Sequence, residues 1–416
     1  MRSGTLENGL RYAVRRSGRS VAYCALTIGC GTRDEAGYPG GIAHFVEHTM
    51  FRGTRRKSAA VISSYLDRLG GELNAYTTKE EIVLHATVLK EDLGKAARLL
   101  FELALEATFP ADGVETERGV VLDEIISYKD NPVEDVYDHF EGLLFAGSPL
   151  EAPILGTAGS VKKIKPEMLR RFVAEMFIPS RMAFTVVADI EENQLEKTVR
   201  NLISRIFANA IPSRTGSRSD ASAKHPSVIA SAPVFNKVID KRHHEANAVV
   251  GGLAPSLYET PERLTAAMLV NILGGPASNS LLNKEIREKK GWVYGIECSY
   301  TQYADTGIAA ISFGCEKPRV EDCLKAVSRI LQQLLETPLS PARLASYRKQ
   351  LLGQLAISNE SGEAQCLSMG KSMIAWGDVA SPEQIRAQIN AITPEDLQAM
   401  ARRIFAPSRL STLVYL

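Results

Sequence analysis

The sequence predicts an α+β protein with two homologous domains, each built on a mixed or antiparallel β-sheet with helices packed mainly on one face. Three observations lead to this prediction: the chain length, one polar segment near the middle, and a strand and helix pattern that occurs twice. At 416 residues the chain exceeds what one hydrophobic core usually supports, so two domains of roughly 200 residues are expected. An apolar fraction of 45% provides enough side chains for two cores.

A polar segment divides the chain. The sequence IPSRTGSRSDASAKHP, from Ile211 to Pro226, is rich in serine, proline and charge and nearly lacks large apolar residues. This composition is typical of a linker. We therefore expect a first domain over residues 1–208, a linker over residues 209–228 and a second domain over residues 229–416.

Strands and helices alternate in the first half and recur in the second. Short apolar runs predict strands, and longer stretches with helical periodicity predict helices. The strands expected in the first half are Leu10–Val14, Val21–Ile28, Ile82–Val88 and Met182–Ala188, and the helices are Ser58–Leu69, Glu91–Leu105 and Val114–Tyr128. The helices expected at the end of the chain are Pro341–Ser358, Gly362–Trp376, Pro382–Ile389 and Pro394–Ile404, before a last strand at Leu410–Tyr415.

The repeat itself can be located. The order glycine, strand, short polar turn, strand and helix begins at Leu69 and again at Lys290. Each half of the chain is therefore expected to hold one copy of the same α+β unit.

Charge and cysteine usage narrow the classes of partner. With 49 basic and 48 acidic residues, the net charge of +1 argues against a nucleic-acid surface or a polybasic membrane patch. No apolar run approaches the about 18 residues of a membrane span, and the first residues lack the apolar core of a signal peptide. The six cysteines have no metal-binding spacing and are expected to be buried, reduced thiols, which favours a cytoplasmic location.

The segment GGIAHFVEHTMFRGT carries a divalent-metal motif formed by His44, Glu47 and His48. On a helix, positions four apart lie roughly 40° from eclipsed and positions three apart roughly 60° the other way, so the three side chains share one face. A plainer interpretation is a surface helix that carries these residues without function. Two neutral imidazoles suit Zn²⁺, however, and the glutamate is placed to accept a proton from a water at the metal. This spacing is the inverted form of the zincin motif.

A third protein ligand is required, because a hydrolytic zinc site has three and leaves one position for water. The helical stretch VETERGVVLDEIISYKDNP offers Glu117 and Glu124. They are two helical turns apart, about 10 Å along the axis, so both cannot easily bind one ion. One should be the ligand and the other a more distant carboxylate that tunes the site. Spacing and periodicity do not choose between them.

Four blocks of the sequence can be considered together: LENGLRYAV, GGIAHFVEHTMFRGT, LNAYTTKEEIVLHATVL followed by ERGVVLDEI, and LLNKEIREKKGWVYGI. They resemble the pitrilysin-like inverzincin family of zinc metallopeptidases. The resemblance covers essentially the whole chain. Within the family, the chain resembles the half-length bacterial members and the mitochondrial processing peptidase beta subunit. It implies that Glu124 is the third metal ligand and that Glu117 is the supporting carboxylate.

The resemblance also implies how a substrate is held. Asn74 and Ala75 fall in the segment that holds the substrate backbone, where a peptide joins a sheet edge as an added strand. Arg287 and Tyr294 match the residues that hydrogen-bond the scissile carbonyl and stabilise the oxyanion. The implied activity is a zinc-dependent endopeptidase acting on peptides or unfolded segments. The alternative is a non-catalytic core subunit or a peptide-binding subunit that needs another chain for turnover.

One zinc ion per chain is expected, since the matching helix of the second repeat reads TAAMLVNILGG and lacks the motif. Long family members fuse two such halves, and their zinc domain faces the Arg and Tyr domain of the other half across a chamber. The resemblance therefore implies a homodimer in which Arg287 and Tyr294 complete the site of the partner chain. The expected partners are a peptide substrate and a second copy of the chain, with no nucleic acid and no membrane.

Overall fold

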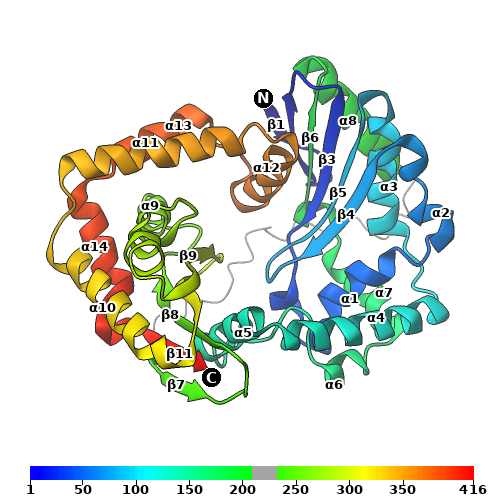
Figure 1. Cartoon of the computed structure of the whole chain (residues 1–416). Coiled ribbons are helices and arrows are strands. Elements are labelled where there is room, and N and C mark those ends of the chain that lie inside the picture. Colours follow the sequence, from blue (N-terminus) through cyan, green and yellow to red (C-terminus); the bar gives the residue numbers. More distant parts are fainter. Residues whose placement is uncertain (209–231) are drawn as a thin grey trace. The chain divides into compact units, whose positions relative to one another are not determined.

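The protein is described by a computed structural model that covers residues 1–208 and 232–416 (Figure 1). About 52% of it is helix and 20% strand, and the strands form two mixed sheets, so the predicted α+β class is confirmed. The linker expected at residues 209–228 lies outside the described residues.

The described residues form two compact units, and neither unit is one continuous stretch of chain. The first unit contains residues 1–125, 152–208 and 356–380, and the second contains residues 126–151, 232–355 and 381–416. Each unit holds one sheet. The domain boundaries expected from the sequence remain a prediction. Residues 126–151 of the first half belong to the second unit, and residues 356–380 of the second half belong to the first unit.

The sheet of the first unit has the strand order β1-β2-β6-β3-β5-β4. Only the β2–β6 pair is parallel. Every residue of β6 is buried, whereas β4 forms an edge of the sheet. The strands are β1 (Arg2–Thr5), β2 (Arg11–Arg16), β3 (Val21–Ile28), β4 (Glu72–Thr77), β5 (Ile82–Leu89) and β6 (Met182–Ala188).

Helices cover both faces of this sheet. In Figure 1, α3 lies on one side of the sheet and α12 on the other. Most helices are on the side of α3, as predicted. Helix α12 covers the opposite face, which was not predicted. The helices of this unit are α1 (Ile42–Met50), α2 (Ala59–Ser63), α3 (Leu93–Glu106), α4 (Ala111–Asp130, whose last turn belongs to the second unit), α6 (Ala158–Val161), α7 (Pro166–Met176), α8 (Glu192–Ala208) and α12 (Gly362–Trp376).

The helix predicted at Ser58–Leu69 is too long. This segment contains only the short helix α2 and, after a break, a 3-10 turn at Asp67–Leu69. The break begins at Ser64, directly after the last residue of α2, Ser63. Two serines in succession favour a helix end, because serine has a lower helix propensity than alanine or leucine.

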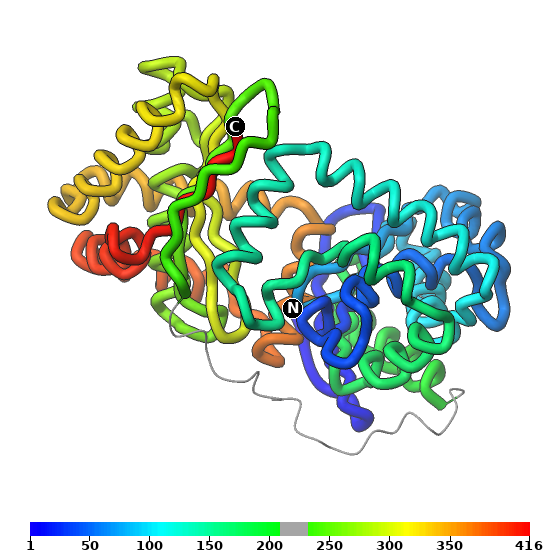
Figure 2. The backbone as a smooth tube through the Cα atoms, turned by 90° about the horizontal axis from the view of Figure 1, so that it is seen from below, coloured from blue at the N-terminus to red at the C-terminus, as the bar shows by residue number. Residues whose placement is uncertain are grey.

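The sheet of the second unit has the order β7-β11-β8-β10-β9. Its only parallel pair joins β7 to β11, and Figure 2 shows the green β7 beside the red C-terminal strand. The helices α9 and α14 pack on one face, and α5 contacts β8, β10 and β11. The elements are β7 (Asn236–Ile239), β8 (Ala246–Ala254), β9 (Val293–Gln302), β10 (Gly307–Cys315), β11 (Ser411–Tyr415), α5 (Pro132–Leu144), α9 (Glu262–Gly274), α10 (Val320–Glu336), α11 (Pro341–Ser358, whose last residues belong to the first unit), α13 (Pro382–Ala391), α14 (Pro394–Phe405) and a π-helix at Asn283–Glu288.

The two segments aligned by sequence have the same local architecture. The antiparallel β4–β5 hairpin precedes α3, and the antiparallel β9–β10 hairpin precedes α10. Both hairpins lie at an edge of their sheet, because β4 and β9 are edge strands.

Small residues let α12 approach its sheet closely. A Cβ atom at Gly370 would collide with the buried Thr27, and the hydroxyl of Thr185 donates to the carbonyl oxygen of Cys366 at 2.9 Å. All six cysteines of the chain are buried and free, as predicted. Among the described residues, no helix is long and apolar enough to cross a membrane.

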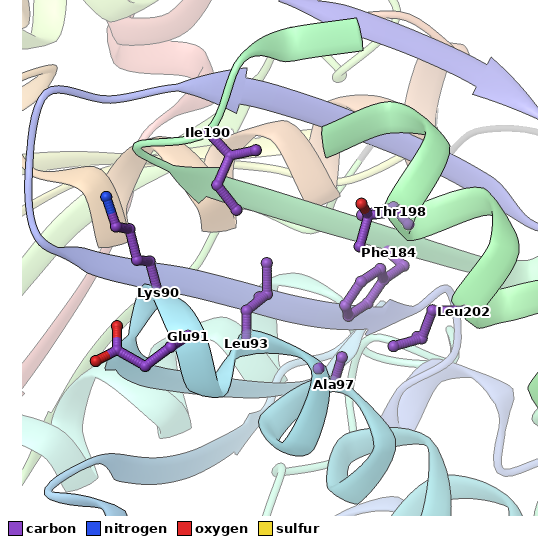
Figure 3. A pocket seen from close by; sticks show the side chains of 10 residues that line it. Lys90, Glu91, Leu93, Ala97, Phe184, Ile190, Thr198 and Leu202 are labelled. Carbon is purple, nitrogen blue, oxygen red and sulfur yellow. The ribbon is translucent and has the colours of Figure 1, made fainter. Parts of the chain in front are cut away.

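A small cavity of about 160 Å³ lies between α3, β6 and α8 in the first unit. Figure 3 shows Phe184, Leu93 and Leu202 among its mainly apolar lining, with Lys90 and Glu91 beside them. None of its lining residues belongs to the metal motif.

Candidate metal centre

The metal motif lies on α1, a nine-residue helix that is buried on most sides. Its N-cap is Gly41 in the left-handed conformation with φ of 87°, and a Cβ there would collide with the carbonyl of Leu155. Only glycine fits both conditions easily. The carboxylate of Glu35 accepts hydrogen bonds from the backbone N–H groups of Gly41 at 2.8 Å and Ala43 at 2.9 Å. These donors have no partner within the helix, so Glu35 acts as its cap.

The partner of α1 is α4, which carries Glu117 and Glu124. In α4, Arg118 donates to the carbonyl oxygen of Ile164 at 2.9 Å and to that of Val161, which holds the helix against the end of α6 and the residues that follow it. Its guanidinium also lies over the ring of Phe45, 5.5 Å from the centroid. These contacts fix α4 beside the motif.

His44, His48 and Glu124 converge on one point. The Oε2 atom of Glu124 lies 3.7 Å from Nε2 of His44 and 3.4 Å from Nε2 of His48. One ligand atom from each residue falls within 4.8 Å of the others, and the described residues contain no other such group of three. The Oε2 atom of Glu124 is buried without a hydrogen-bond partner. A buried carboxylate oxygen without a donor is unfavourable unless a cation compensates it.

Glu117 contacts the same imidazole from its other side. Its Oε2 atom lies 2.9 Å from Nδ1 of His48, and its Oε1 atom accepts from the guanidinium of Arg52. A carboxylate beside Nδ1 holds a hydrogen on Nδ1, so Nε2 is the nitrogen that can bind a metal once its own proton is released. The two glutamates that sequence spacing left equivalent therefore occupy different positions around His48.

The surroundings move the pKa values of the two imidazoles in opposite directions. Burial, and then the neighbouring His48, lower the pKa of His44 to about 4. Burial also lowers the pKa of His48, but its contacts with Glu124 and Glu117 outweigh burial and raise it to about 9. The nearby His48 is also the main cause that lowers the pKa of Glu124. The carboxylates of Glu47, Glu117 and Glu124 thus surround His48 with negative charge.

Glu47 faces β4. Its Oε2 atom accepts a hydrogen bond of 2.8 Å from the hydroxyl of Thr77, the last residue of that strand. Burial raises the pKa of Glu47, an effect that the bond from Thr77 partly offsets. Glu47 is absent from the group of convergent ligand atoms.

The predicted substrate residues Asn74 and Ala75 lie on β4 and point to opposite faces. Asn74 pairs with His85, whose ring contacts Glu363 of α12 at 3.1 Å, so Asn74 lies on the α12 face. Ala75 packs against the main core of the first unit and shares its face with Thr77. The backbone of both residues belongs to the edge strand.

Arg287 and Tyr294 belong to the second unit and are not part of the cluster in the first. Arg287 lies in the π-helix, and its guanidinium is 3.7 Å from Glu288. Tyr294 is 59% exposed on β9, and the negative charge of Glu245 is the main cause that raises its pKa. Both side chains are accessible.

Three residues around the motif were not predicted. Arg52 could have been found, because it lies one helical turn after His48 in the same segment. Thr77 could have been found from the alternation along β4, two residues after Ala75. Glu35 lies in a loop, and no periodic pattern relates it to α1.

Comparison with known proteins agrees with these features. The sequence matches the model of the insulinase family, peptidase family M16, over residues 11–158, and that of the peptidase M16 inactive domain over residues 163–351. A Streptomyces coelicolor protein named an uncharacterized zinc protease is 30% identical over 97% of this chain and 87% of its own length. The Bacillus subtilis uncharacterized zinc protease YmxG is 28% identical over 99% of this chain and 97% of its own.

Solved structures share the fold of the chain. A crystal structure of a protease from Helicobacter pylori superposes with a TM-score of 0.89 at 20% identity, covering 100% of this chain and 99% of that one. At this identity the likeness shows the shared fold alone. The two family matches, which cover most of the sequence, and the 30% identical relative show that the chain belongs to peptidase family M16, the insulinase family.

Proposed function

We propose that the protein is a zinc-dependent endopeptidase of the inverzincin type. In this proposal His44, His48 and Glu124 hold one Zn²⁺ per chain and Glu47 is the general base. The observation that carries it is the buried Oε2 atom of Glu124, which has no hydrogen-bond partner and lies 3.4 and 3.7 Å from two imidazole nitrogens. The names of the relatives, zinc proteases, support the same activity.

The donor set fits zinc. Two imidazole nitrogens and one carboxylate oxygen form a ligand set that catalytic zinc sites use, with a further position for water. When bound, Zn²⁺ lowers the pKa of a water molecule and polarises the carbonyl of the substrate. Glu117 and Arg52 support the set, since the Nδ1 contact orients the ring of His48.

Glu47 then moves the proton. It accepts a proton from the attacking water, whose oxygen bonds to the carbonyl carbon, and it delivers that proton to the leaving amine as the C–N bond breaks. Arg287 and Tyr294 are proposed to donate hydrogen bonds to the oxyanion. Their exposure on the second unit supports a role toward a partner chain or a substrate.

The substrates are proposed to be extended peptides or unfolded segments. The edge strand β4 carries Asn74 and Ala75, and its free side offers backbone groups to which an extended peptide can add as a further strand. We propose a homodimer that encloses them in a chamber with two sites, each shared between the chains.

A quenched fluorogenic peptide library tests the proposal on the purified chain alone. We expect hydrolysis that stops with a chelator and returns with Zn²⁺. The Glu47→Gln variant should keep zinc near one per chain, measured by mass spectrometry, and lose activity by orders of magnitude. A zinc-loaded chain without hydrolysis would support the peptide-binding subunit instead, and a chain that binds neither zinc nor peptides would support a structural core subunit.

A further inference from the structure

The general base proposed above is held by a side chain from a different element. Glu47 lies on α1, and the hydroxyl of Thr77 reaches its Oε2 atom at 2.8 Å from the end of β4. A carboxylate rotates easily about its last torsion, which is broad and roughly two-fold. One bond to Oε2 therefore fixes the plane of the group and leaves Oε1 to receive a proton.

The position of Thr77 is set by its strand and its turn. Thr77 pairs with the buried Ile82, and the backbone N–H of Thr78 donates to the carbonyl of Glu81 at 2.8 Å to close the turn. As a β-branched residue, Thr77 also has few side-chain rotamers. Its hydroxyl is thus in place before any substrate arrives.

A second segment braces the same turn. The backbone N–H of Arg33 donates to the carbonyl of Lys79 at 2.9 Å, and the guanidinium of Arg33 contacts Glu80 at 2.6 Å. The side chain of Arg33 is 5% exposed, so solvent screens this ion pair little. Two residues later Glu35 caps α1. One loop therefore ties both the turn after Thr77 and the start of the motif helix to the same framework.

We propose that Thr77 is a positioning residue that orients Glu47 for proton transfer. This inference rests on the proposed function, in which Glu47 is the base. Thr77 keeps its own proton throughout: the proton of the attacking water passes to Oε1 of Glu47 and then to the leaving amine. Without the hydroxyl, the Oε2 atom loses its donor and the carboxylate turns away from the productive orientation.

The test compares Thr77→Val, which has nearly the same shape and no hydroxyl, with Thr77→Ser, which keeps the hydroxyl. We expect Thr77→Val to lower kcat about ten- to a hundredfold with KM changed less than about twofold, since orientation is lost and not binding. Thr77→Ser should retain kcat within a few-fold. Zinc content should be unchanged in both variants, because Thr77 touches no proposed metal ligand.

Thr185→Val is the matched control. It removes a buried threonine hydroxyl from the same sheet on the α12 face and should lower stability without lowering kcat. A second readout needs no activity: in metal-free protein, Thr77→Val and Glu47→Gln should be non-additive in the midpoint of urea unfolding, because each removes the same bond.

The outcomes separate the inference from the proposed function. If the wild type is an active, chelator-sensitive peptidase but Thr77→Val keeps its kcat, or both Thr77 variants are equally impaired, the positioning role is wrong and the proposed function stands. Additive unfolding midpoints would likewise overturn it. If the wild type hydrolyses no peptide, both fall together.

Discussion

His48 has a carboxylate on each side of its ring. Glu124 approaches Nε2 and Glu117 approaches Nδ1, and the ring of His44 lies 4.6 Å away, centroid to centroid. The imidazole of His48 thus separates an inner carboxylate, whose Oε2 atom has no donor, from an outer carboxylate that is bound to Arg52. Their chemical roles should differ accordingly.

Glutamine substitutions test this difference. Glu124→Gln should lose most of its zinc, because an amide oxygen is a weak ligand, whereas Glu117→Gln should keep most of it and lose activity about 10- to 100-fold. Zinc is measured by mass spectrometry after dialysis. Asp123→Asn, on an exposed residue of the same helix, is the control and should change neither quantity. Equal zinc contents in the two glutamate variants would show that the assignment is mistaken.

The sequence predicts the inner residues of the site better than their supports. His44, Glu47 and His48 follow from helical spacing, since the whole pattern lies within one helix. The choice between Glu117 and Glu124 needed the family resemblance, because both have the same phase on α4. Thr77 and Glu35 reach α1 from other elements, and such contacts depend on tertiary packing that no local period records.

At the scale of elements, α1 depends on a buried carboxyl group at its start. Glu35 is 7% exposed, and burial raises its pKa to about 7, although the two backbone donors favour the charged form. An acid with a raised pKa in the folded state destabilises that state wherever the unfolded chain is ionised.

The stability of the wild type should therefore fall as pH rises from about 4.5 to about 7, the unfolded and folded pKa values of Glu35. Glu35→Gln is neutral in both states and lacks this contribution. We expect the unfolding free energy of the wild type to decline relative to this variant by up to about 3 kcal/mol over that window. Urea unfolding of metal-free protein at several pH values measures the difference. A difference that stays constant with pH would contradict the buried, titrating Glu35.

The packing of α12 provides a second prediction at this scale. Gly370→Ala should destabilise the protein by about 1–3 kcal/mol, because the new methyl group meets Thr27 in a closely packed contact. Gly119→Ala is the control, since Gly119 is an exposed helical glycine with no atom near its Cβ position, and it should stabilise by about 0.5–1 kcal/mol. Thermal unfolding of both variants gives the comparison. Equal shifts in melting temperature would show that α12 does not pack as described.

Start and stop signals also explain which elements were predicted. The helices α11 and α12 have their expected bounds: α11 begins at Pro341, and α12 lies between the N-cap Ser361 and Gly377. The strands β3 and β6 also have their expected bounds, because each is a short, mainly apolar run. The helix predicted at Ser58–Leu69 was too long, because apolar spacing does not take account of the two serines at which α2 ends. The placement of α5 and α12 against the sheet of the other half was not predicted, since it is a property of the tertiary fold.

The assembly concerns the whole molecule. If Arg287 and Tyr294 complete the site of a partner chain, an inactive Glu47→Gln chain and an inactive Arg287→Ala chain should restore activity when they exchange subunits. One site of the mixed dimer then collects both lesions and the other none, so random exchange should give about a quarter of wild-type activity. Peptide hydrolysis before and after exchange is the measurement, and each variant alone is the control. A mixture as inactive as its parents would indicate sites built within one chain.

The packing of α12 against the sheet formed by the first half of the chain also has a consequence for synthesis on the ribosome. The last strand of the first sheet ends at Ala188, but the helix that covers its second face ends at Trp376. At about 5–20 residues per second, the ribosome needs on the order of 10–40 s to make the intervening chain. During this time the apolar face formed by Ala25, Val83 and Val187 has no cover from α12. The nascent chain should therefore bind a chaperone such as a ribosome-associated holdase until its final third has emerged.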